Sequence, residues 1–366
     1  MKKWKARHKA MAGILVVTAV CYGISWKFPG AVDWYKNYIF PIGTNTLSRL
    51  MSVVSWSVGE ILIYLGIFAL AAAVLTGILC IFFKGRVRAF GKLYLEGVLW
   101  AVVWVLATEN FNCYMLYHAG TLEETYFSGI AGKEETLVVV YNDMVERANE
   151  LSLQMERDEK GGVVYHGDLY EECKSAMRSL GEEFSYLRGY YPNPKKILAS
   201  DFMSQQNLAG IYFPFTLEAN YNTTMYIMNQ AATICHEMSH LKGVILEDEA
   251  NFFGFLACIR SGDSFLAYSG YLSVLGYVSH EVRQNVDLET RKTMAVPNDL
   301  VQKDAVFLTE EEWERVEKKA LVKTETVNQA TNAFLDGNLK INGVKDGVES
   351  YSRVVRLILK WYEKGE

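Results

Sequence analysis

Long apolar runs are confined to the first third of the chain. Residues 11–27 follow a basic leader, residues 58–83 contain a long uncharged stretch, and residues 93–112 form a third apolar run. A helix needs about 20 apolar residues to cross a bilayer. The pattern predicts a membrane anchor over residues 1–115 with about three transmembrane helices.

Two of these runs have alternative interpretations. The first has the basic leader of a secretory signal peptide, but it lacks an A-x-A-like cleavage site, which favours an uncleaved anchor. In the third, Glu96 and Glu109 bracket an apolar core that is short for a span, so the alternative is a helix at the membrane interface or packed on the soluble region. Its Trp and Tyr residues are typical of membrane boundaries and favour a true span.

Basic residues indicate how the anchor is oriented. Five of them precede the first apolar run, and four more follow the second: Lys84, Arg86, Arg88 and Lys92. Because positive charge marks the cytoplasmic side, both segments are expected to be cytoplasmic. With three spans, residues 116–366 lie outside the cytoplasm, and with two they lie inside. We expect a multi-pass membrane protein whose soluble domain is extracytoplasmic.

The region after the anchor has the patterns of a mostly helical domain. Residues 134–155 and 168–186 have the periodicity of amphipathic helices, and residues 265–278 are typical of a buried helix. Residues 210–215 are rich in aromatic and β-branched types, and Pro214 confines them to a sheet edge if they form a strand. The predicted fold is mainly α, with N-terminal transmembrane helices followed by a mostly helical domain with a small β-sheet.

Charge and cysteine usage exclude some classes of function. The net charge of -5 provides no basic surface field, so we expect no nucleic-acid partner. The six cysteines form no CxxC pair, so neither a zinc ribbon nor a dense disulfide framework is indicated. The sequence leaves the oligomeric state open.

Residues 236–240 match the metal-binding pattern HExxH. On a helix, side chains four residues apart share a face, so His236 and His240 can bind one ion while Glu237 sits beside it. The pattern arises by chance in roughly one chain of this length in a hundred, so alone it is a moderate signal. Gly243 is placed to end such a helix in a left-handed cap.

A third ligand is available a few residues later. Glu247, Asp248 and Glu249 begin a second apolar-faced helix, and a carboxylate is a regular partner of two histidines at catalytic zinc. Glu247 is the preferred ligand, with Glu249 as the alternative, and Asn251 can hydrogen-bond a ligating side chain from one turn further on. Three acids also suit the first turn of any helix, but the adjoining HExxH favours a Zn²⁺ site.

With these residues the chain resembles the gluzincin metallopeptidases, in which HExxH is followed on a later helix by a ligand Glu with Asp or Asn four positions on. Glu247 and Asn251 fit that pattern. The gap after His240 is shorter than in thermolysin-like enzymes, and no His or Tyr proton donor is placed by motif. The wider chain is similar to a bacterial family known as domain of unknown function 3810, which implies a bacterial cell membrane location. The likeness covers nearly the whole chain and rests on residues 210–216, 218–220, 236–240, 247–252 and 342–351.

The expected function is a membrane-anchored zinc metalloendopeptidase, with a peptide or protein as substrate and the lipid bilayer as a partner. A zinc-activated water would attack the peptide carbonyl with Glu237 as general base. An extended peptide would pair with the predicted edge strand through Ile211, Tyr212 and Phe213. Four side chains are considered as oxyanion stabilisers, although packing or surface roles are favoured for each: Tyr268, Tyr271, Tyr351 and Arg353.

Two other functions are weighed against this one. An inactive or regulatory membrane protein could bind a peptide or ligand on the same scaffold, but the intact HExxH argues against it. A transporter component is disfavoured because charge is nearly absent from the apolar runs.

Overall fold

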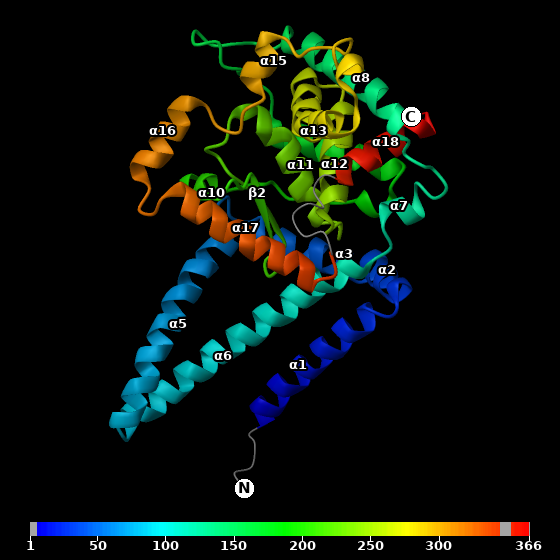
Figure 1. Ribbon diagram of the computed structural model, residues 1–366. Coiled ribbons are helices and arrows are strands. Elements are labelled where there is room, and N and C mark those ends of the chain that lie inside the picture. Colours follow the sequence, from blue (N-terminus) through cyan, green and yellow to red (C-terminus); the bar gives the residue numbers. More distant parts are fainter. Residues whose placement is uncertain (1–5, 345–352, 366) are drawn as a thin grey trace. The chain divides into compact units, whose positions relative to one another are not determined.

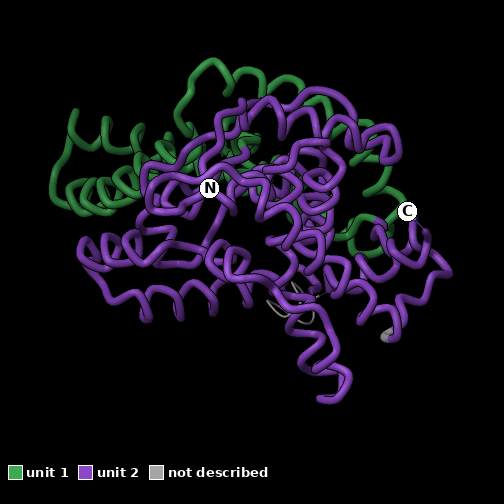
Figure 2. The backbone as a smooth tube through the Cα atoms, turned by 90° about the horizontal axis from the view of Figure 1, so that it is seen from above, with its two compact units in different colours: residues 1–119, 213–218 green, residues 120–212, 219–366 purple. Residues whose placement is uncertain are grey.

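A computed structural model describes residues 6–344 and 353–365, which form helices and one small sheet (Figure 1). The mainly α class with a small sheet is confirmed. The chain divides into two compact units, coloured separately in Figure 2. Unit 1 comprises Met1–Ala119 and Phe213–Glu218, and unit 2 comprises Gly120–Tyr212 and Ala219–Glu366.

Unit 1 contains three long apolar helices, α1 (Ala6–Ser25), α5 (Val58–Phe82) and α6 (Arg86–Asn112). Each is long and apolar enough to cross a membrane, which is compatible with a membrane protein. The third helix begins at Arg86 rather than at residue 93, and by its length and mean hydropathy it qualifies as a candidate span. The connecting elements are α2 (Pro29–Tyr38), α3 (Phe40–Gly43), η1 (Thr44–Ser48), α4 (Arg49–Met51) and η2 (Tyr114–His118).

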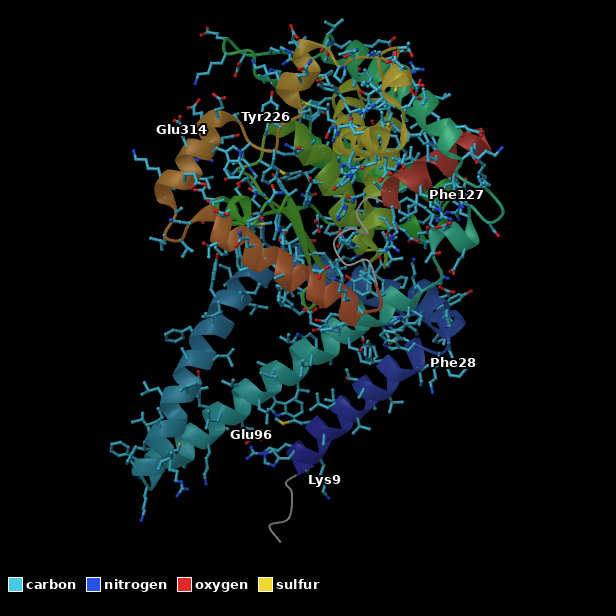
Figure 3. All side chains as sticks on the ribbon, in the orientation of Figure 1. Lys9, Phe28, Glu96, Phe127, Tyr226 and Glu314 are labelled. Atoms are coloured by element: carbon cyan, nitrogen blue, oxygen red, sulfur yellow. The ribbon has the colours of Figure 1, made fainter. Side chains whose placement is uncertain are left out.

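Side-chain contacts within unit 1 fix the directions of these helices. α5 and α6 form an antiparallel hairpin (Figure 1), in which the Tyr94 hydroxyl donates to the carbonyl of Ala69 at 2.8 Å. α1 runs parallel to α6, because Arg7 pairs with Glu96 toward their starts and the Trp26 ring contacts that of His118 beyond their ends. Figure 3 shows Lys9 and Glu96 toward one end of α1 and Phe28 just past the other. Arg7 and Lys9 at the start of α1 and the loop after α5 therefore lie at the same end of unit 1.

Helices α11, α12 and α13 form the centre of unit 2, and α8, α9 and α18 pack around them. The predicted helices over residues 134–155, 168–186 and 265–278 correspond to α8, α9 with two following 3₁₀ turns, and α13. The helices and 3₁₀ turns of unit 2 are α7 (Leu122–Thr125), α8 (Glu134–Ser152), α9 (Leu169–Ser179), η3 (Leu180–Glu182), η4 (Ser185–Leu187), α10 (Ser200–Gln205), η5 (Ile227–Asn229), α11 (Gln230–His240), α12 (Glu247–Ile259), α13 (Ser264–Asn285), α14 (Leu288–Arg291), α15 (Asp299–Asp304), α16 (Glu310–Lys319), α17 (Thr324–Ile341) and α18 (Val354–Lys364).

The sheet has three strands, β1 (Lys195–Lys196), β2 (Gly210–Phe213) and β3 (Glu218–Tyr221), in the order β1-β3-β2. β1 and β3 are parallel, with Lys195 opposite Asn220. β2 is one of the two outer strands, as predicted, and ends one residue before Pro214. One edge of β2 is therefore without a strand neighbour among the described residues.

Helices α11 and α12 approach each other closely because α12 carries a glycine at the contact. A Cβ at Gly254 would lie 2.9 Å from the carbonyl oxygen of Ala232 and 3.3 Å from the backbone nitrogen of His236. Ser269 of α13 donates to the carbonyl of Met228 at 2.6 Å and accepts from the Ala232 N–H at 3.2 Å. The start of α11 is thereby fixed between α12 and α13.

Replacing Gly254 by Ala should destabilise the protein by about 1–3 kcal/mol, because the added methyl group overlaps the backbone of α11. Gly276→Ala on α13 is the matched control, since a Cβ there meets no atom within 4 Å, and replacing an exposed helical glycine stabilises by up to about 1 kcal/mol. Chemical unfolding of the two full-length variants in detergent measures the difference. Equal stabilities would contradict the close helix contact.

Candidate metal centre

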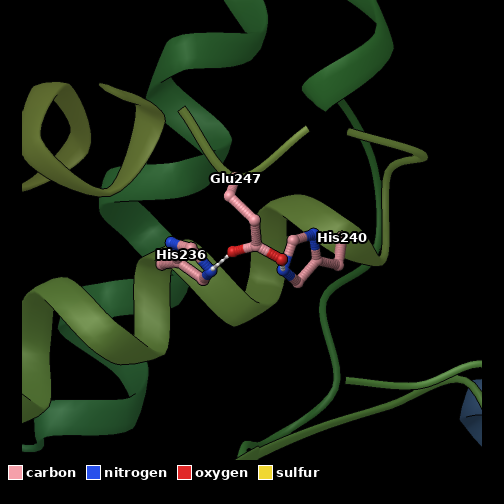
Figure 4. Close-up of side chains that lie close together, drawn as sticks. All are labelled: His236, His240 and Glu247. Atoms are coloured by element: carbon pink, nitrogen blue, oxygen red, sulfur yellow. Dashed lines mark ion pairs between the residues drawn. The ribbon is translucent and has the colours of Figure 1, made fainter. Parts of the chain in front are cut away.

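The HExxH pattern lies on α11, and helical spacing places both imidazoles on one face. The ring centroids of His236 and His240 are 4.8 Å apart. Glu247, the first residue of α12, points between them (Figure 4), with Oε2 3.2 Å from His236 Nε2 and Oε1 4.0 Å from His240 Nε2. One ligand atom from each residue lies within 4.8 Å of the others, so the three could hold one metal ion.

The outer nitrogen of each imidazole is engaged by the protein. His240 Nδ1 lies 2.6 Å from the carbonyl oxygen of Val244, which can only accept, so Nδ1 carries the proton. His236 Nδ1 lies 2.8 Å from Oδ1 of Asn251 and donates to it in the same way. When the rings are neutral, both Nε2 lone pairs therefore face Glu247, as metal ligands require.

A left-handed glycine turn brings Glu247 back to the histidines. Gly243 has φ +77°, which confirms the predicted helix end, and its N–H donates to the carbonyl of His240 at 3.0 Å. This turn also returns the Val244 carbonyl to the imidazole of His240. The short connection between α11 and α12 is therefore long enough to bring the Glu247 carboxylate to the two histidines.

Glu237 lies beside this cluster and is nearly inaccessible to solvent, with 4% of its surface exposed. Its Oε2 atom has no hydrogen-bond partner among the described residues. Burial raises the pKa of the Glu237 carboxyl to about 8. A buried carboxylate oxygen without a partner costs free energy, so this site retains a group that folding alone does not satisfy.

The Glu247 carboxylate attracts positive charge to the cluster. Burial by itself would lower the pKa of His236, but the Glu247 carboxylate raises it to about 9. Burial lowers the pKa of His240 to about 4. Despite its own burial, Glu247 has a lowered pKa because His236 stabilises its charge. Two imidazole nitrogens and a carboxylate beside an unsatisfied Glu237 oxygen fit the donor set of catalytic zinc.

The alternative ligand Glu249 points elsewhere. Its carboxylate accepts a hydrogen bond from the backbone N–H of Leu122 at the start of α7. The intervening Asp248 forms an ion pair with Arg353 at 3.5 Å. Of the three acids in this helix turn, Glu247 alone among the described residues joins the two histidines.

The candidate oxyanion stabilisers are engaged away from the histidines. The Tyr268 hydroxyl is fully buried and donates to Asp304 at 2.9 Å, and the ring of Tyr271 packs against Phe255. Arg353 pairs with Asp248. Tyr351, and residues 345–351 of the late family segment, lie outside the described residues.

The first residue of the edge strand β2, Gly210, lies against the HExxH helix α11. A Cβ at Gly210 would overlap the side chain of Glu237, so a larger residue there would displace that carboxylate. The ring of Tyr212 lies 5.6 Å from that of His240. The Ile211 carbonyl accepts from the Asn220 side chain of β3 at 3.1 Å. Phe213, by contrast, is buried in unit 1, against Gly59 of α5.

Sequence reasoning did not single out three neighbours of the cluster. Gly210 and Gly254 carry no side chain to suggest a role, and only the close approach of another backbone or carboxylate reveals one. Tyr277 of α13 is the third: burial, and then the charge of Glu247, raise the pKa of its hydroxyl. An isolated tyrosine in a helix gave no signal of that neighbour in the sequence.

Comparison with known proteins identifies the family. No curated protein and no solved structure matches the chain. The model of a family described as "Protein of unknown function (DUF3810)" matches residues 35–359, from within α2 to within α18. The matched region contains α5, α6, the hairpin of β2 and β3, and the whole His236–His240–Glu247 cluster. The chain therefore belongs to the DUF3810 family.

Proposed function

We propose that this protein is a membrane-anchored zinc-dependent metallopeptidase. The observation that carries the proposal is the convergence of the two Nε2 atoms and the Glu247 carboxylate next to an unpartnered, buried Glu237. His236, His240 and Glu247 would hold the ion. When bound, zinc would act as a Lewis acid that lowers the pKa of a coordinated water toward about 7 and polarises a substrate carbonyl.

Glu237 would serve as the general base. Its unpartnered oxygen can accept a proton from a water or pass one to a leaving amine without first breaking a hydrogen bond to the protein. Asn251 and the Val244 carbonyl would keep both imidazoles oriented during this transfer.

The outer edge of β2 would bind the substrate. An extended peptide can add to a sheet edge through its own backbone, which selects for unfolded or flexible segments. Gly210 lies against Glu237 and Tyr212 against His240, so a peptide paired with this strand would pass beside the general base. A substrate held in this way would react faster, because its scissile bond would already be oriented toward the catalytic groups.

We further propose that α1, α5 and α6 span the cytoplasmic membrane of a bacterial cell and that unit 2 is extracytoplasmic. Arg7 and Lys9 at the start of α1 share one end of unit 1 with the basic segment after α5, and this would be the cytoplasmic end. The chain leaves α6 at the opposite end.

Purified full-length protein should contain about one zinc ion per chain. His236→Ala, His240→Ala and Glu247→Ala should each weaken zinc affinity at least about 10-fold, because three protein ligands are the minimum for such a site. Glu249→Gln should retain the metal, since that carboxylate binds a backbone N–H elsewhere. Elemental analysis after dialysis measures the content. Equal metal in all four variants would remove the proposed site.

Glu237→Gln should keep zinc but lose cleavage of an unfolded test protein by roughly 10²- to 10⁴-fold, because the amide cannot take a proton. Metal content and initial cleavage rates are compared with the wild type in the same detergent. Unchanged cleavage would exclude Glu237 as the base. A wild-type protein that binds zinc and an unfolded chain without cleaving it would instead indicate a regulatory or binding role.

A reporter that is active only outside the cytoplasm should be active when fused after Gly120 and inactive when fused after Gly85, because α6 separates the two positions. Inactivity at both positions would contradict a span through α6.

A further inference from the structure

The two oxygens of the Glu237 carboxylate have different surroundings. Oε2 is buried and has no hydrogen-bond partner among the described residues. Oε1 lies at the start of β2, where a Cβ added to Gly210 would overlap it and would be 2.8 Å from the carboxyl carbon. The start of β2 thus contacts one oxygen of the carboxylate, while the other has no polar partner in the protein.

The backbone conformation of Gly210 does not require a glycine. Gly210 is not among the glycines with a positive φ, so other residues can adopt its φ angle. The three atoms nearest to an added Cβ all belong to the side chain of Glu237. The absence of a side chain at position 210 therefore makes room for the carboxylate rather than for a turn.

Asn222, the residue after β3, holds the segment that leads into Gly210. It is completely buried, and its Nδ2 donates to the Leu208 carbonyl at 3.0 Å and to Ser204 Oγ of α10 at 2.9 Å. Its backbone N–H donates to the Ala209 carbonyl at 2.8 Å. Because a buried amide without partners costs free energy, these hydrogen bonds favour a single position of the backbone just before the strand.

The side-chain amide of Asn222 is itself fixed by its neighbours. Its Oδ1 accepts from the backbone N–H of Thr224 at 2.8 Å. Its partner Ser204 is also completely buried and donates to the Ser200 carbonyl at 3.0 Å. Every residue in this series of contacts, from Ser200 to Glu237, lies in unit 2.

We propose that Asn222 fixes the start of β2 and that Gly210 thereby positions the Glu237 carboxylate, with Oε2 left free to accept a proton. This inference rests on the proposed peptidase function, in which Glu237 is the general base. Asn222 and Gly210 are positioning residues in it, because their effect on the reaction passes through Glu237. Metal binding is independent of them, since the three candidate ligands lie on α11 and α12.

Gly210→Ala tests the contact with Glu237 directly. The added methyl group must displace the carboxylate, whereas Gly276→Ala adds the same group on α13, where no atom lies within 4 Å of it. Glu237→Ala provides a second background for the substitution, because it removes the atoms that the methyl group would meet.

Asn222→Ala tests the hold on the segment before Gly210. Asn298→Ala is its control, because the Asn298 amide makes the same kinds of hydrogen bond at the start of α15. Its Nδ2 donates to Ser152 Oγ at 3.0 Å, and its Oδ1 accepts from the Val301 N–H at 2.8 Å. Both substitutions remove a hydrogen-bonded amide, but only Asn222→Ala releases the start of β2.

All variants are measured as full-length protein in one detergent, and zinc content should be unchanged throughout. For an extended peptide, kcat should fall roughly 10- to 100-fold in Gly210→Ala and Asn222→Ala relative to their controls, the effect of displacing a reacting group by about 1 Å. KM should change much less, because the Asn220 side chain still holds the Ile211 carbonyl. Hydrogen exchange over residues 208–212 should be at least about 10-fold faster in Asn222→Ala than in its control, since local opening becomes easier.

The proposal fails if either variant matches its control in kcat, or if either loses zinc together with activity. If the wild type cleaves no peptide, the peptidase function fails separately, and chemical unfolding decides alone. Gly210→Ala should then lower the unfolding midpoint more when Glu237 is present than in the Glu237→Ala background, because only the first pair of groups is in contact. Equal shifts in the two backgrounds, zero included, would exclude positioning of Glu237 by Gly210.

Discussion

The backbone contact between α11 and α12 at Gly254 is the constraint on which the candidate site depends. It brings Glu247, in the first turn of α12, close to His236 and His240 on α11. Helix α11 alone supplies only two of the three candidate ligands. Asn251 lies between Glu247 and Gly254 on the same face of α12, so the contact also brings the amide to His236. One glycine thus governs both a ligand and the group that orients another ligand.

The site contains a buried carboxylate that is not fully hydrogen-bonded. Asp304 of α15 shows the contrasting case, because this buried carboxylate receives hydrogen bonds from Arg157, Tyr226 and Tyr268. At the cluster, Glu237 has a buried oxygen without a partner, and Glu247 draws a positive charge onto His236. An unpartnered buried polar group costs roughly 1–3 kcal/mol, so the presence of one beside two histidines is informative about function.

The hairpin of β2 and β3 is divided between the two units, because its turn, Phe213–Glu218, belongs to unit 1 and the rest of its residues to unit 2. The chain leaves unit 2 at Phe213, contacts the ends of α5 and α6, and returns at Ala219. The backbone N–H of Gly59 and the side chains of Ser48 and Asn112 hold this turn by hydrogen bonds within unit 1.

The sequence by itself determined the features that neighbouring residues encode. The apolar runs predicted α1, α5 and α6. The HExxH spacing placed two imidazoles on one helix face, and Gly243 predicted where that helix ends. Each of these predictions depends only on residues that are close together in the sequence. Only the tertiary structure decided between Glu247 and Glu249, since the latter is held by Leu122, 127 positions away. Likewise, Glu218 meets Gly59 across 159 positions and carries the hairpin turn into unit 1. Such contacts follow from how whole helices pack, which no local pattern records.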